Sequence, residues 1–289
     1  KINAVGTPDK PIVMTSEKEE PGAWGGIHIC GRAHTNAEGG KGSSEIGGAV
    51  YGGNDDADNS GTLQYIRLEY TGFAFDEEHE ANGISFYGVG NGTIVDHCQA
   101  YKGSDDGFEF FGGSVNVSNL VAVSCSDDSF DWTEGWNGKG TNLVAYQEAE
   151  STLGYDCDCL MECDNNGSNN AATPVAHPVL KNLILVGNGG SKQGIRLRAG
   201  TEVEIDNAKV CGKGQPLTVE TALTENALKN GTSKLTNITL TAELSSKEGI
   251  YTHADFIAVT SNKVNANLSY SSFEDIRKEC SWMNGSWVK

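Results

Sequence analysis

The most constraining feature of this sequence is a degenerate repeat of about two dozen residues. The segment Ser104-Asp105-Asp106-Gly107-Phe108-Glu109-Phe110 recurs as Ser126-Asp127-Asp128-Ser129-Phe130-Asp131-Trp132, 22 positions later. A period of about 20–25 residues with alternating apolar positions is typical of a solenoid whose coils are built from strands. The repeat therefore predicts an all-β fold, a right-handed parallel β-helix.

A second pattern, apolar-x-x-apolar-x-apolar, recurs along the chain and marks one strand in each coil. Its last two apolar positions alternate like one face of a strand, and we expect the first to lie across a bend. The uneven spacing of the matches is what loop insertions between fixed coils produce. The matches are Leu63/Ile66/Leu68, Val95/Cys98/Ala100, Val117/Leu120/Ala122, Leu180/Leu183/Leu185, Ile205/Ala208/Val210 and Leu235/Ile238/Leu240, with Gly140/Leu143/Ala145 as a weaker seventh.

Each of five coils also contains a candidate second strand, with two apolar residues flanking one that points outward. The five pairs are Ile84-x-Phe86, Phe108-x-Phe110, Phe130-x-Trp132, Tyr155-x-Cys157 and Ile195-x-Leu197. The residues that we expect to face solvent are Ser85, Glu109, Asp131, Asp156 and Arg196.

The whole chain is expected to form one domain, because each coil of a solenoid buries its apolar face against its neighbours. We assign residues 1–215 to β-helix coils and residues 216–289 to further coils and a capping or assembly segment. Short helices are expected at residues 218–230 and 272–280, the second with a capping box between Ser272 and Asp275. We expect such helices to cover an end of the solenoid, where strand edges are unpaired.

The chain is acidic, with 39 Asp and Glu against 21 Lys and Arg and a net charge of −18. This balance argues against nucleic acid and against anionic membrane surfaces, which both require clustered positive charge. The sequence contains no apolar run of about 18 residues that would cross a membrane. The charge instead favours cations and neutral or basic partners.

The eight cysteines are an even number without zinc-type C-x-x-C pairs, which is compatible with disulfides and an extracytoplasmic location. Cys157, Cys159 and Cys163 are close enough in sequence to predict one local disulfide. Cys98 occupies a core position of the repeat, so we expect it to be a buried, small apolar residue or a partner of a near neighbour.

Several short motifs resemble a family of secreted or cell-surface parallel β-helix proteins of aquatic bacteria. They include Gly22-Ala23-Trp24-Gly25-Gly26, Tyr51-Gly52-Gly53-Asn54-Asp55, Gly88-Val89-Gly90-Asn91-Gly92-Thr93, Glu162-Cys163-Asp164-Asn165-Asn166 and the two Asp-Asp segments. The resemblance covers roughly residues 5–210 and implies a β-helix fold and an extracellular or outer-surface location. It assigns no catalytic residues.

The two Asp-Asp segments are candidates for a Ca²⁺ site. Adjacent strands stack about 4.8 Å apart, so Asp105, Asp106, Asp127 and Asp128 would converge at one corner of the helix. Carboxylate oxygens at that density suit Ca²⁺, and without a cation they would raise one another's pKa. The alternative is that these side chains cap backbone N–H groups in tight turns. Two acidic loops, Asp55-Asp56-Ala57-Asp58 and Asp76-Glu77-Glu78-His79-Glu80, are weaker candidates.

Glu109 and Asp131 are the candidate catalytic pair, because stacked carboxylates about 5 Å apart suit a retaining glycosidase. A lyase would need a basic group beside these acids, and Arg196 and Arg198 lie on a later coil, so they are not obviously adjacent. Trp136 is a candidate for stacking on a sugar ring, with Glu109 and Asp131 as further ligand-binding residues. Trp132 alternates inward with Phe130 and is expected in the core.

The features together predict an extracellular or cell-surface β-helix module that acts in adhesion, glycan binding or surface structure, without catalysis and with Ca²⁺ support. Its partners would be an extracellular polysaccharide or other surface proteins. The alternatives are a polysaccharide lyase or glycoside hydrolase, and a self-assembling filament subunit. Residues 1–7 resemble the middle of a coil, which suggests a processed or truncated chain, and such an open end offers unpaired strand edges to another subunit.

Overall fold

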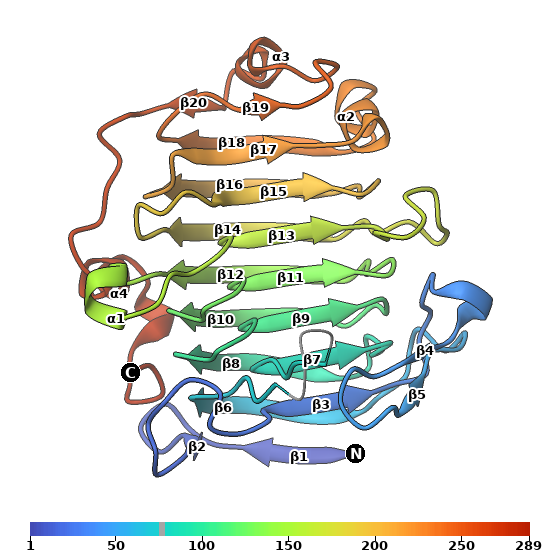
Figure 1. Ribbon diagram of the computed structural model, residues 1–289, viewed down its shortest axis with the longest axis vertical. Helices are drawn as coiled ribbons and strands as arrows, with labels where there is room; N and C mark the ends of the chain where they lie inside the picture. Colours follow the sequence, from blue (N-terminus) through green and yellow to red (C-terminus); the bar gives the residue numbers. More distant parts are fainter. Residues whose placement is uncertain (75–78) are drawn as a thin grey trace.

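The computed structural model describes residues 1–74 and 79–289 and shows a right-handed parallel β-helix whose coils stack along one long axis (Figure 1). Two parallel sheets run along that axis. The first sheet contains β1 (Ile2–Val5), β2 (Ile12–Met14), β6 (Gly61–Glu69), β8 (Ile94–Tyr101), β10 (Val117–Val123), β12 (Lys139–Tyr146), β14 (Val179–Val186), β16 (Glu204–Cys211), β18 (Lys234–Leu240) and β20 (Lys263–Val264). The second contains β3 (Ile27–Cys30), β7 (Ile84–Tyr87), β9 (Phe108–Phe111), β11 (Phe130–Thr133), β13 (Met161–Asp164), β15 (Gln193–Arg198), β17 (Gln215–Val219) and β19 (Ser245–Ser246).

The remaining elements lie in the connections between coils. The strands β4 (Gly42–Ser43) and β5 (Val50–Tyr51) form a small antiparallel hairpin. The helices are α1 (Glu150–Leu153), α2 (Ala222–Lys229), α3 (His253–Ala258) and α4 (Phe273–Glu279), with short 3₁₀ turns at Glu38–Gly40 and Ser281–Met283. None of the helices in the described part of the chain is both long and apolar enough to cross a membrane.

The register of the first sheet confirms the apolar repeat. Leu120 pairs with Cys98 on one side and with Leu143 on the other, so the weak match around Leu143 is a full coil. In the second sheet Phe130 pairs with Phe108, which places the two Asp-Asp segments on adjacent coils, as the 22-residue offset predicts. Cys98 is fully buried at its core position, as expected.

The bend predicted inside each repeat is a single residue in the left-handed region. Asparagine tolerates this conformation better than most residues, because its short amide side chain bonds locally. The side chains of Asn119, Asn142, Asn182 and Asn207 form a ladder of amide hydrogen bonds of 2.8–3.0 Å along the solenoid. The bend residues are Tyr65, His97, Asn119, Asn142, Asn182, Asn207 and Asn237, with φ between 52° and 64°.

Aromatic side chains fill the space between the two sheets. Phe108 stacks on Phe130 with ring centroids 5.6 Å apart, and Trp132 is buried beside them, as predicted. Trp136 is also in this core, stacked on Phe110 at 4.1 Å. The core explains why the alternating positions of the second strands are large and aromatic.

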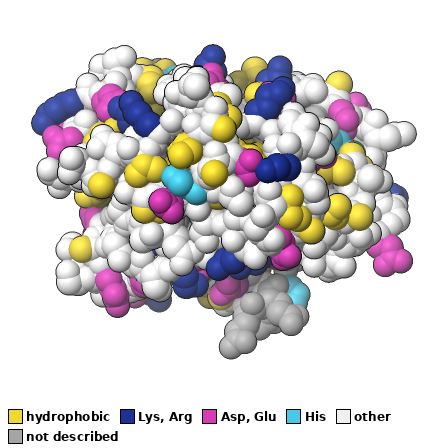
Figure 2. Space-filling model, turned by 90° about the horizontal axis from the view of Figure 1, so that it is seen from above, with side chains coloured by type: hydrophobic (Ala, Val, Ile, Leu, Met, Phe, Trp, Pro, Cys, Tyr) yellow, Lys and Arg dark blue, Asp and Glu magenta, His cyan; other side chains and the backbone are white. Residues whose placement is uncertain are grey.

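The helix α2 begins later than expected, because residues 215–219 extend the second sheet as β17. The expected capping box at Ser272 is absent, since Ser272 makes no side-chain cap hydrogen bond. A capping box does form at α3, between Thr252 and Asp255. The helix α3 covers the C-terminal end of the solenoid, and Figure 2 shows that end with scattered rather than continuous hydrophobic side chains.

The expectation that the helix at 272–280 covers an end is wrong. Residues 273–289, which we call the C-terminal strap, run back along the outer face of the first sheet (Figure 1). The outer face carries apolar side chains such as Val121 and Val144, and Ile276, Met283 and Trp287 of the strap pack against them. Apolar residues on an outward sheet face require such a cover, which explains the path of the strap.

All eight cysteines are free thiols, so the predicted disulfide among Cys157, Cys159 and Cys163 is wrong. Cys163 lies in the core, whereas the Sγ of Cys159 bonds with polar side chains of Asp158 and Gln193. Cys157 and Cys159 lie in the connection before β13, and only Cys163 lies within the strand, so residues that are close in sequence belong to different local structures. The cysteines therefore give no support to an extracytoplasmic location.

Candidate functional site

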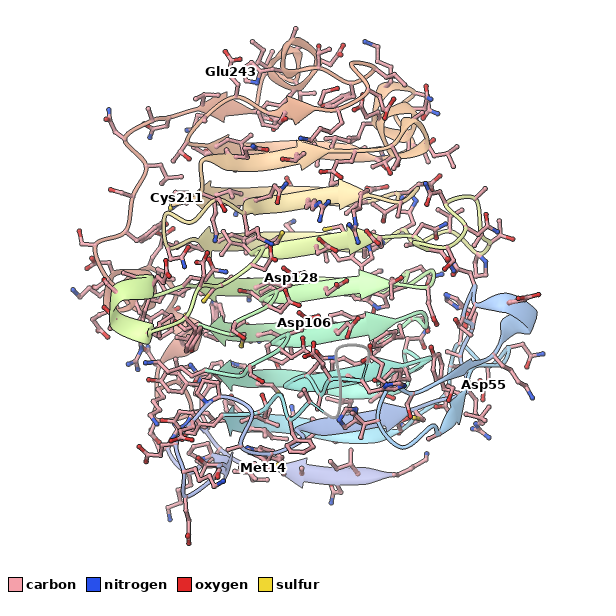
Figure 3. The ribbon with its side chains drawn as sticks, in the orientation of Figure 1. Met14, Asp55, Asp106, Asp128, Cys211 and Glu243 are labelled. Carbon is pink, nitrogen blue, oxygen red and sulfur yellow. The ribbon has the colours of Figure 1, made fainter. Side chains whose placement is uncertain are left out.

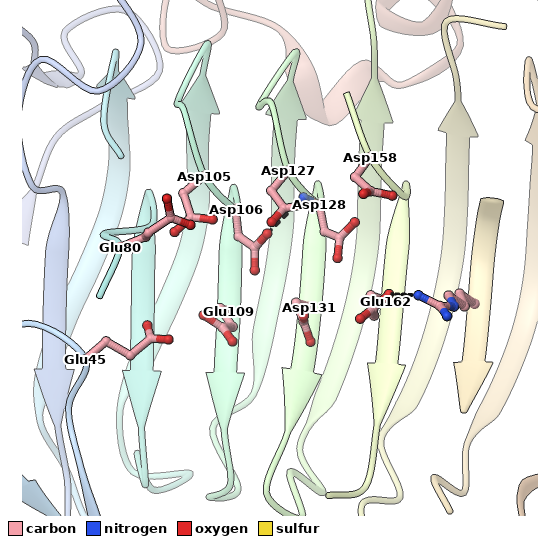
Figure 4. Close-up of a pocket in the computed structure, with 11 residues that line it drawn as sticks. Glu45, Glu80, Asp105, Asp106, Glu109, Asp127, Asp128, Asp131, Asp158 and Glu162 are labelled. Atoms are coloured by element: carbon pink, nitrogen blue, oxygen red, sulfur yellow. Dashed lines mark hydrogen bonds and ion pairs between the residues drawn. The ribbon is translucent and has the colours of Figure 1, made fainter. Parts of the chain in front are cut away.

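The outward positions of the second sheet form a row of charged side chains. Glu109 pairs in register with Asp131, Asp131 with Glu162, and Glu162 with Arg196. Because parallel coils stack without offset, one residue in each coil contributes to the row. Figure 4 shows Glu109, Asp131 and Glu162 side by side on neighbouring strands.

A second row of carboxylates precedes these strands. Asp106 and Asp128 lie one above the other at the starts of β9 and β11 (Figure 3), with Asp105 and Asp127 beside them (Figure 4). The convergence of these four side chains was predicted from the repeat, and the structure brings them together.

The two rows line one cavity of about 370 Å³, which we call the acidic groove. Among the residues that the structure describes, ten carboxylates and one guanidinium line it, and none of these lining residues is aromatic. Its residues are Glu45, Glu80, Asp105, Asp106, Glu109, Asp127, Asp128, Asp131, Asp158, Glu162 and Arg196.

Hydrogen bonds between coils hold the Asp-Asp turns. The carboxylate of Asp106 accepts from the backbone N–H of Asp128 at 2.8 Å, and that of Asp128 accepts from the N–H of Cys159 at 2.7 Å. Asn82 accepts from the N–H of Asp106 at 3.2 Å in the preceding coil. Asp106 and Asp128 therefore cap backbone N–H groups, as the alternative interpretation predicted. The N–H groups that they cap belong to the next coil and not to their own turns.

Three sets of carboxylates are close enough to share a cation, each with one oxygen per residue within 4.8 Å of the others. These sets are Asp105/Asp106/Asp127, Asp106/Glu109/Asp131 and Asp128/Asp131/Glu162. A fourth set joins Asp128, Asp158 and the Cys159 thiol. Burial raises the pKa of this thiol, and hard cations prefer oxygen ligands, so we count only the three all-carboxylate sets as candidate cation sites.

Burial and mutual repulsion raise the pKa of the groove carboxyls. Burial, with the charges of Glu80 and Asp127, raises the pKa of Asp105 to about 7, and burial raises that of Asp127 to about 6. For Asp106, burial and the charges of Glu109 and Asp128 raise the pKa well above its usual value. Such a groove is stable only with protons or with cations among its carboxylates.

Glu109 and Asp131, the predicted catalytic pair, lie together in the groove. Burial, followed by the charge of Asp131, raises the pKa of Glu109 well above its ordinary value. Burial and the charge of Glu162 do the same for Asp131, although Arg198 opposes the effect. Glu109 also accepts a hydrogen bond of 2.6 Å from Asn82.

Arg196 lines the acidic groove, and both Arg196 and Arg198 form ion pairs with Glu162 rather than with Glu109 or Asp131. Arg196 pairs with Glu162 at 2.9 Å and with Glu220 at 3.2 Å. Arg198 pairs with Glu162 at 2.7 Å and with Asp164 at 2.8 Å. The arginines sit on β15, which is the immediate neighbour of β13.

The sequence reasoning missed Glu162 because it placed the strand of that coil at Tyr155-x-Cys157. Those residues lie in the connection between α1 and β13, and Asp156 is not an outward strand position. The strand is Met161–Asp164, where Met161 and Cys163 are buried and Glu162 faces out. The alternation of the apolar residues Met161 and Cys163 around Glu162 indicates this strand in the sequence. The insertion before it shifts the strand away from the position that the repeat predicts.

The assignment of Trp136 to a binding face is wrong, because only 1% of its surface is exposed. Its Nε1–H donates to the backbone oxygen of Val115 at 3.1 Å, which satisfies the only polar group of the buried ring. The short Gly135–Asn137 turn directs the side chain inward instead of exposing it.

The two weaker acidic loops differ in outcome. Asp58 pairs with Arg32 at 2.8 Å and Asp56 contacts His34 at 2.7 Å, so these two carboxylates of the first loop already have partners within the chain. In the second, Asp76, Glu77 and Glu78 lie outside the described residues. Glu80 lines the acidic groove, together with Glu45 from the loop between β4 and β5, and no repeat pattern pointed to either residue.

Residues 1–288 match the family described as the pectate-lyase-like β-helix domain. The chain belongs to this family. No curated protein and no solved structure matches it. Membership of the pectate-lyase-like β-helix family agrees with the coil architecture over the full length of the chain, and it leaves the role of the acidic groove to be argued from its geometry.

Proposed function

We propose that the acidic groove binds divalent cations, Ca²⁺ first among them, and uses them to hold an anionic polysaccharide. The observation that carries this proposal is the presence of three overlapping sets of three carboxylates each, whose oxygens lie within 4.8 Å of one another; Asp106 and Asp131 each belong to two of these sets. Ca²⁺ takes six to eight oxygen ligands with flexible geometry, which suits a row of carboxylates that also has room for water. Asp106 and Asp128 are each 5% exposed. In each side chain one carboxylate oxygen accepts a hydrogen bond from a backbone N–H, and the other oxygen is left to bind a cation.

An anionic ligand would be repelled by a bare chain of net charge −18. Cations in the groove reverse this charge locally and present open coordination positions to sugar carboxylates or sulfates. Arg196 and Arg198 at the far end of the row add fixed positive charge with planar, bidentate geometry. The groove offers a neutral glycan fewer favourable contacts, because no aromatic ring lines it within residues 1–74 and 79–289.

The proposed role is binding rather than catalysis. Burial acts to lower the pKa of Arg196, but the hydrogen bond to Glu220 and the charge of Glu162 outweigh it and raise that pKa above its ordinary value. A protonated guanidinium binds an anion well and abstracts a proton poorly. The glycosidase alternative would place Glu109 and Asp131 in the reaction, whereas the cation proposal uses both carboxylates as ligands.

A polysaccharide lyase is the second candidate, and Arg196 is the observation that favours it. Elimination from a uronate requires cations on the carboxylate and a base near the adjacent C–H. Arg196 is the basic residue among the described residues that line the groove. Cations that engage Glu162 would weaken its pairing with Arg196 and lower the pKa of the guanidinium.

We place this activity outside the cell or on its surface, as an adhesion or matrix-binding module that engages polysaccharide or other surface proteins. Extracellular Ca²⁺ modules work with dissociation constants of about 10⁻⁴–10⁻³ M, which a groove with several carboxylates can reach. Self-association through the ends of the solenoid remains an alternative role. It is supported by β1, whose outer edge has no partner strand among the described residues.

The deciding experiment is calorimetric titration of the chelator-treated protein with Ca²⁺ and with Mg²⁺. We expect Ca²⁺ to bind and to raise the melting temperature, because a ligand of the native state stabilises it by mass action. The variant Asp106→Asn with Asp128→Asn keeps both hydrogen-bond acceptors and removes two charges, and it should lose the response. Asp9→Asn with Glu17→Gln makes the same charge change at exposed positions and should keep it.

Ligand choice is tested by co-sedimentation with insoluble polyuronate, sulfated glycan or neutral glucan, each with Ca²⁺ or with chelator. Calcium-dependent retention on the anionic polymers alone supports the proposal. Ultraviolet absorbance of unsaturated products from the same mixtures tests the lyase alternative, and Arg196→Lys should abolish any such signal. Absence of Ca²⁺ binding in the calorimeter would overturn both readings.

A further inference from the structure

Lys213 is an almost fully buried lysine in the turn that follows β16, with 4% of its surface exposed. Its methylene stem packs over Gly187, where a Cβ atom would lie 2.6 Å from the Lys213 Cγ. Among the described residues, no carboxylate oxygen lies within 4.0 Å of the Nζ. A buried ammonium without a carboxylate partner is costly, and its position calls for an explanation.

The Nζ of Lys213 is held against the side-chain amide of Asn188. It donates to Asn188 Oδ1 at 2.9 Å and to the backbone oxygen of Cys157 at 3.1 Å. The backbone N–H of Gly190 donates to the same Oδ1 at 3.0 Å. On its other side, the amide Nδ2 of Asn188 donates to the Asp156 carboxylate at 2.8 Å.

These four groups are the parts of an acyl-transfer site: an amine, an amide carbonyl, a donor to the carbonyl oxygen and a carboxylate on the leaving nitrogen. We propose that Lys213 and Asn188 join in an intramolecular isopeptide bond, with Asp156 as the proton-transfer group. This modification site is separate from the acidic groove and does not depend on the function proposed for it.

The reaction balances without any added reagent. The neutral Nζ attacks Cγ of Asn188 and forms an N–C bond, and the negative charge that develops on Oδ1 is stabilised by the Gly190 N–H. In the tetrahedral intermediate both nitrogens are bonded to the same carbon, so Asp156, which already accepts a hydrogen bond from Nδ2, can take the proton from the attacking nitrogen and deliver it to Nδ2. The Cγ–Nδ2 bond then breaks, ammonia leaves, and an amide between the two side chains remains.

The protonation states favour this direction. Burial lowers the pKa of Lys213, which increases the fraction of neutral, nucleophilic amine. Burial acts to raise the pKa of Asp156, but hydrogen bonds from Asn188 and from the Cys157 N–H outweigh it, so the carboxyl is ionised and able to accept a proton. The contacts hold amine and amide together, which supplies the effective concentration that such a slow reaction needs.

The bond would connect two neighbouring coils. Asn188 follows β14 and Lys213 follows β16, and these strands pair in register from Val179↔Glu204 to Val186↔Cys211. In a solenoid each coil contacts only its neighbours, so coils are held against separation by those contacts alone. A covalent link at this turn would prevent the two coils from separating even when the C-terminal part unfolds.

Intact-mass measurement of the purified full chain tests the proposal. We expect a mass below that of the sequence by one ammonia molecule, and a branched peptide that joins Lys213 to Asn188 after proteolysis. Lys213→Met and Asn188→Ala should each restore the sequence mass, Asp156→Asn should slow the loss of ammonia, and Lys181→Met, a lysine exposed on β14, should behave like the wild type.

One side reaction mimics the mass change. Asn188 precedes Gly189, and an Asn-Gly pair also loses ammonia when it closes to a succinimide. The succinimide does not involve a lysine, so ammonia loss that persists in Lys213→Met would overturn the proposal. A wild-type mass equal to that of the sequence would overturn it as well, and the branched peptide stands as evidence even if a variant fails to fold.

Discussion

Asp106 accepts a hydrogen bond from the backbone N–H of Asp128 at 2.8 Å, across the boundary between two coils. One carboxylate oxygen thus fixes the position of the next turn, and the other remains in the acidic groove. The same side chain is therefore a structural cap and a candidate cation ligand. Substitutions at these positions must separate the two roles, and the chain allows this because asparagine keeps the acceptor and removes the charge.

Asp128→Ala and Asp128→Asn should differ in stability. Alanine leaves the buried N–H of Cys159 without its acceptor, and we expect the free energy of unfolding to fall by about 1–3 kcal/mol. Asparagine preserves the bond and relieves repulsion, so in chelator its stability should equal or exceed that of the wild type. Urea unfolding in chelator measures the free energy of unfolding of both variants. An equal decrease in this free energy for the two variants would contradict a capping role.

The cation-free protein should become more stable as the pH falls from about 7 toward 4. The pKa of Asp105 is about 7 and that of Asp127 about 6, against an ordinary 3.8, so in this range the folded protein binds more protons than the unfolded chain. Each extra bound proton changes the free energy of unfolding by about 1.4 kcal/mol per pH unit, and this stability is lost as pH rises through the folded-state pKa values.

Denaturant unfolding at several pH values checks this, with Asp105→Asn and Asp127→Asn together as the comparison. The double variant should show a flatter pH dependence than the wild type. Saturating Ca²⁺ should flatten the wild-type curve in the same way, because cations take the place of protons. A wild-type stability that depends on pH as weakly as that of the double variant would contradict the assignment.

Trp136 should matter for stability and not for ligand binding. Its ring is stacked on Phe110 in the core, so Trp136→Ala should cost about 3–5 kcal/mol of unfolding free energy. Trp136→Phe retains much of the packing and should bind polysaccharide as the wild type does. Loss of binding by a folded Trp136→Phe protein would restore the sugar-stacking role.

The C-terminal strap should be a strong contributor to stability. Trp287 is fully buried against the outer face of the first sheet, and we expect Trp287→Ala to cost about 3–5 kcal/mol. Leu223→Ala on α2, where the side chain is half exposed, serves as the control and should change stability by less than about 1 kcal/mol. Thermal or urea unfolding of both variants measures the difference.

The filament alternative makes its own prediction at β1. Val5 is exposed on this edge strand, and association through the edge would make light scattering rise with protein concentration. Val5→Lys should then reduce the scattering, because a charge on an edge strand opposes pairing with another chain. A single particle size at all concentrations would rule out end-to-end assembly of this chain.

The sequence by itself determined the coil architecture. The apolar repeat places Ile66, Cys98, Leu120 and their counterparts in one register, and the bend inside it coincides with residues such as Asn142 in the left-handed region. Both are local patterns repeated in every coil, so each copy reinforces the others. The stacking of the two Asp-Asp turns followed from the same periodicity.

The tertiary structure alone decided what lies beside those turns. Glu45 and Glu80 reach the groove from loops outside the repeat, and Arg196 reaches Glu162 because the insertion before β13 does not break the stacking of the coils. The inward turn of Trp136 and the path of the strap depend on contacts between segments far apart in sequence. A repeat specifies which residues face outward, but the charge and depth of the groove arise only when loops of different coils pack together.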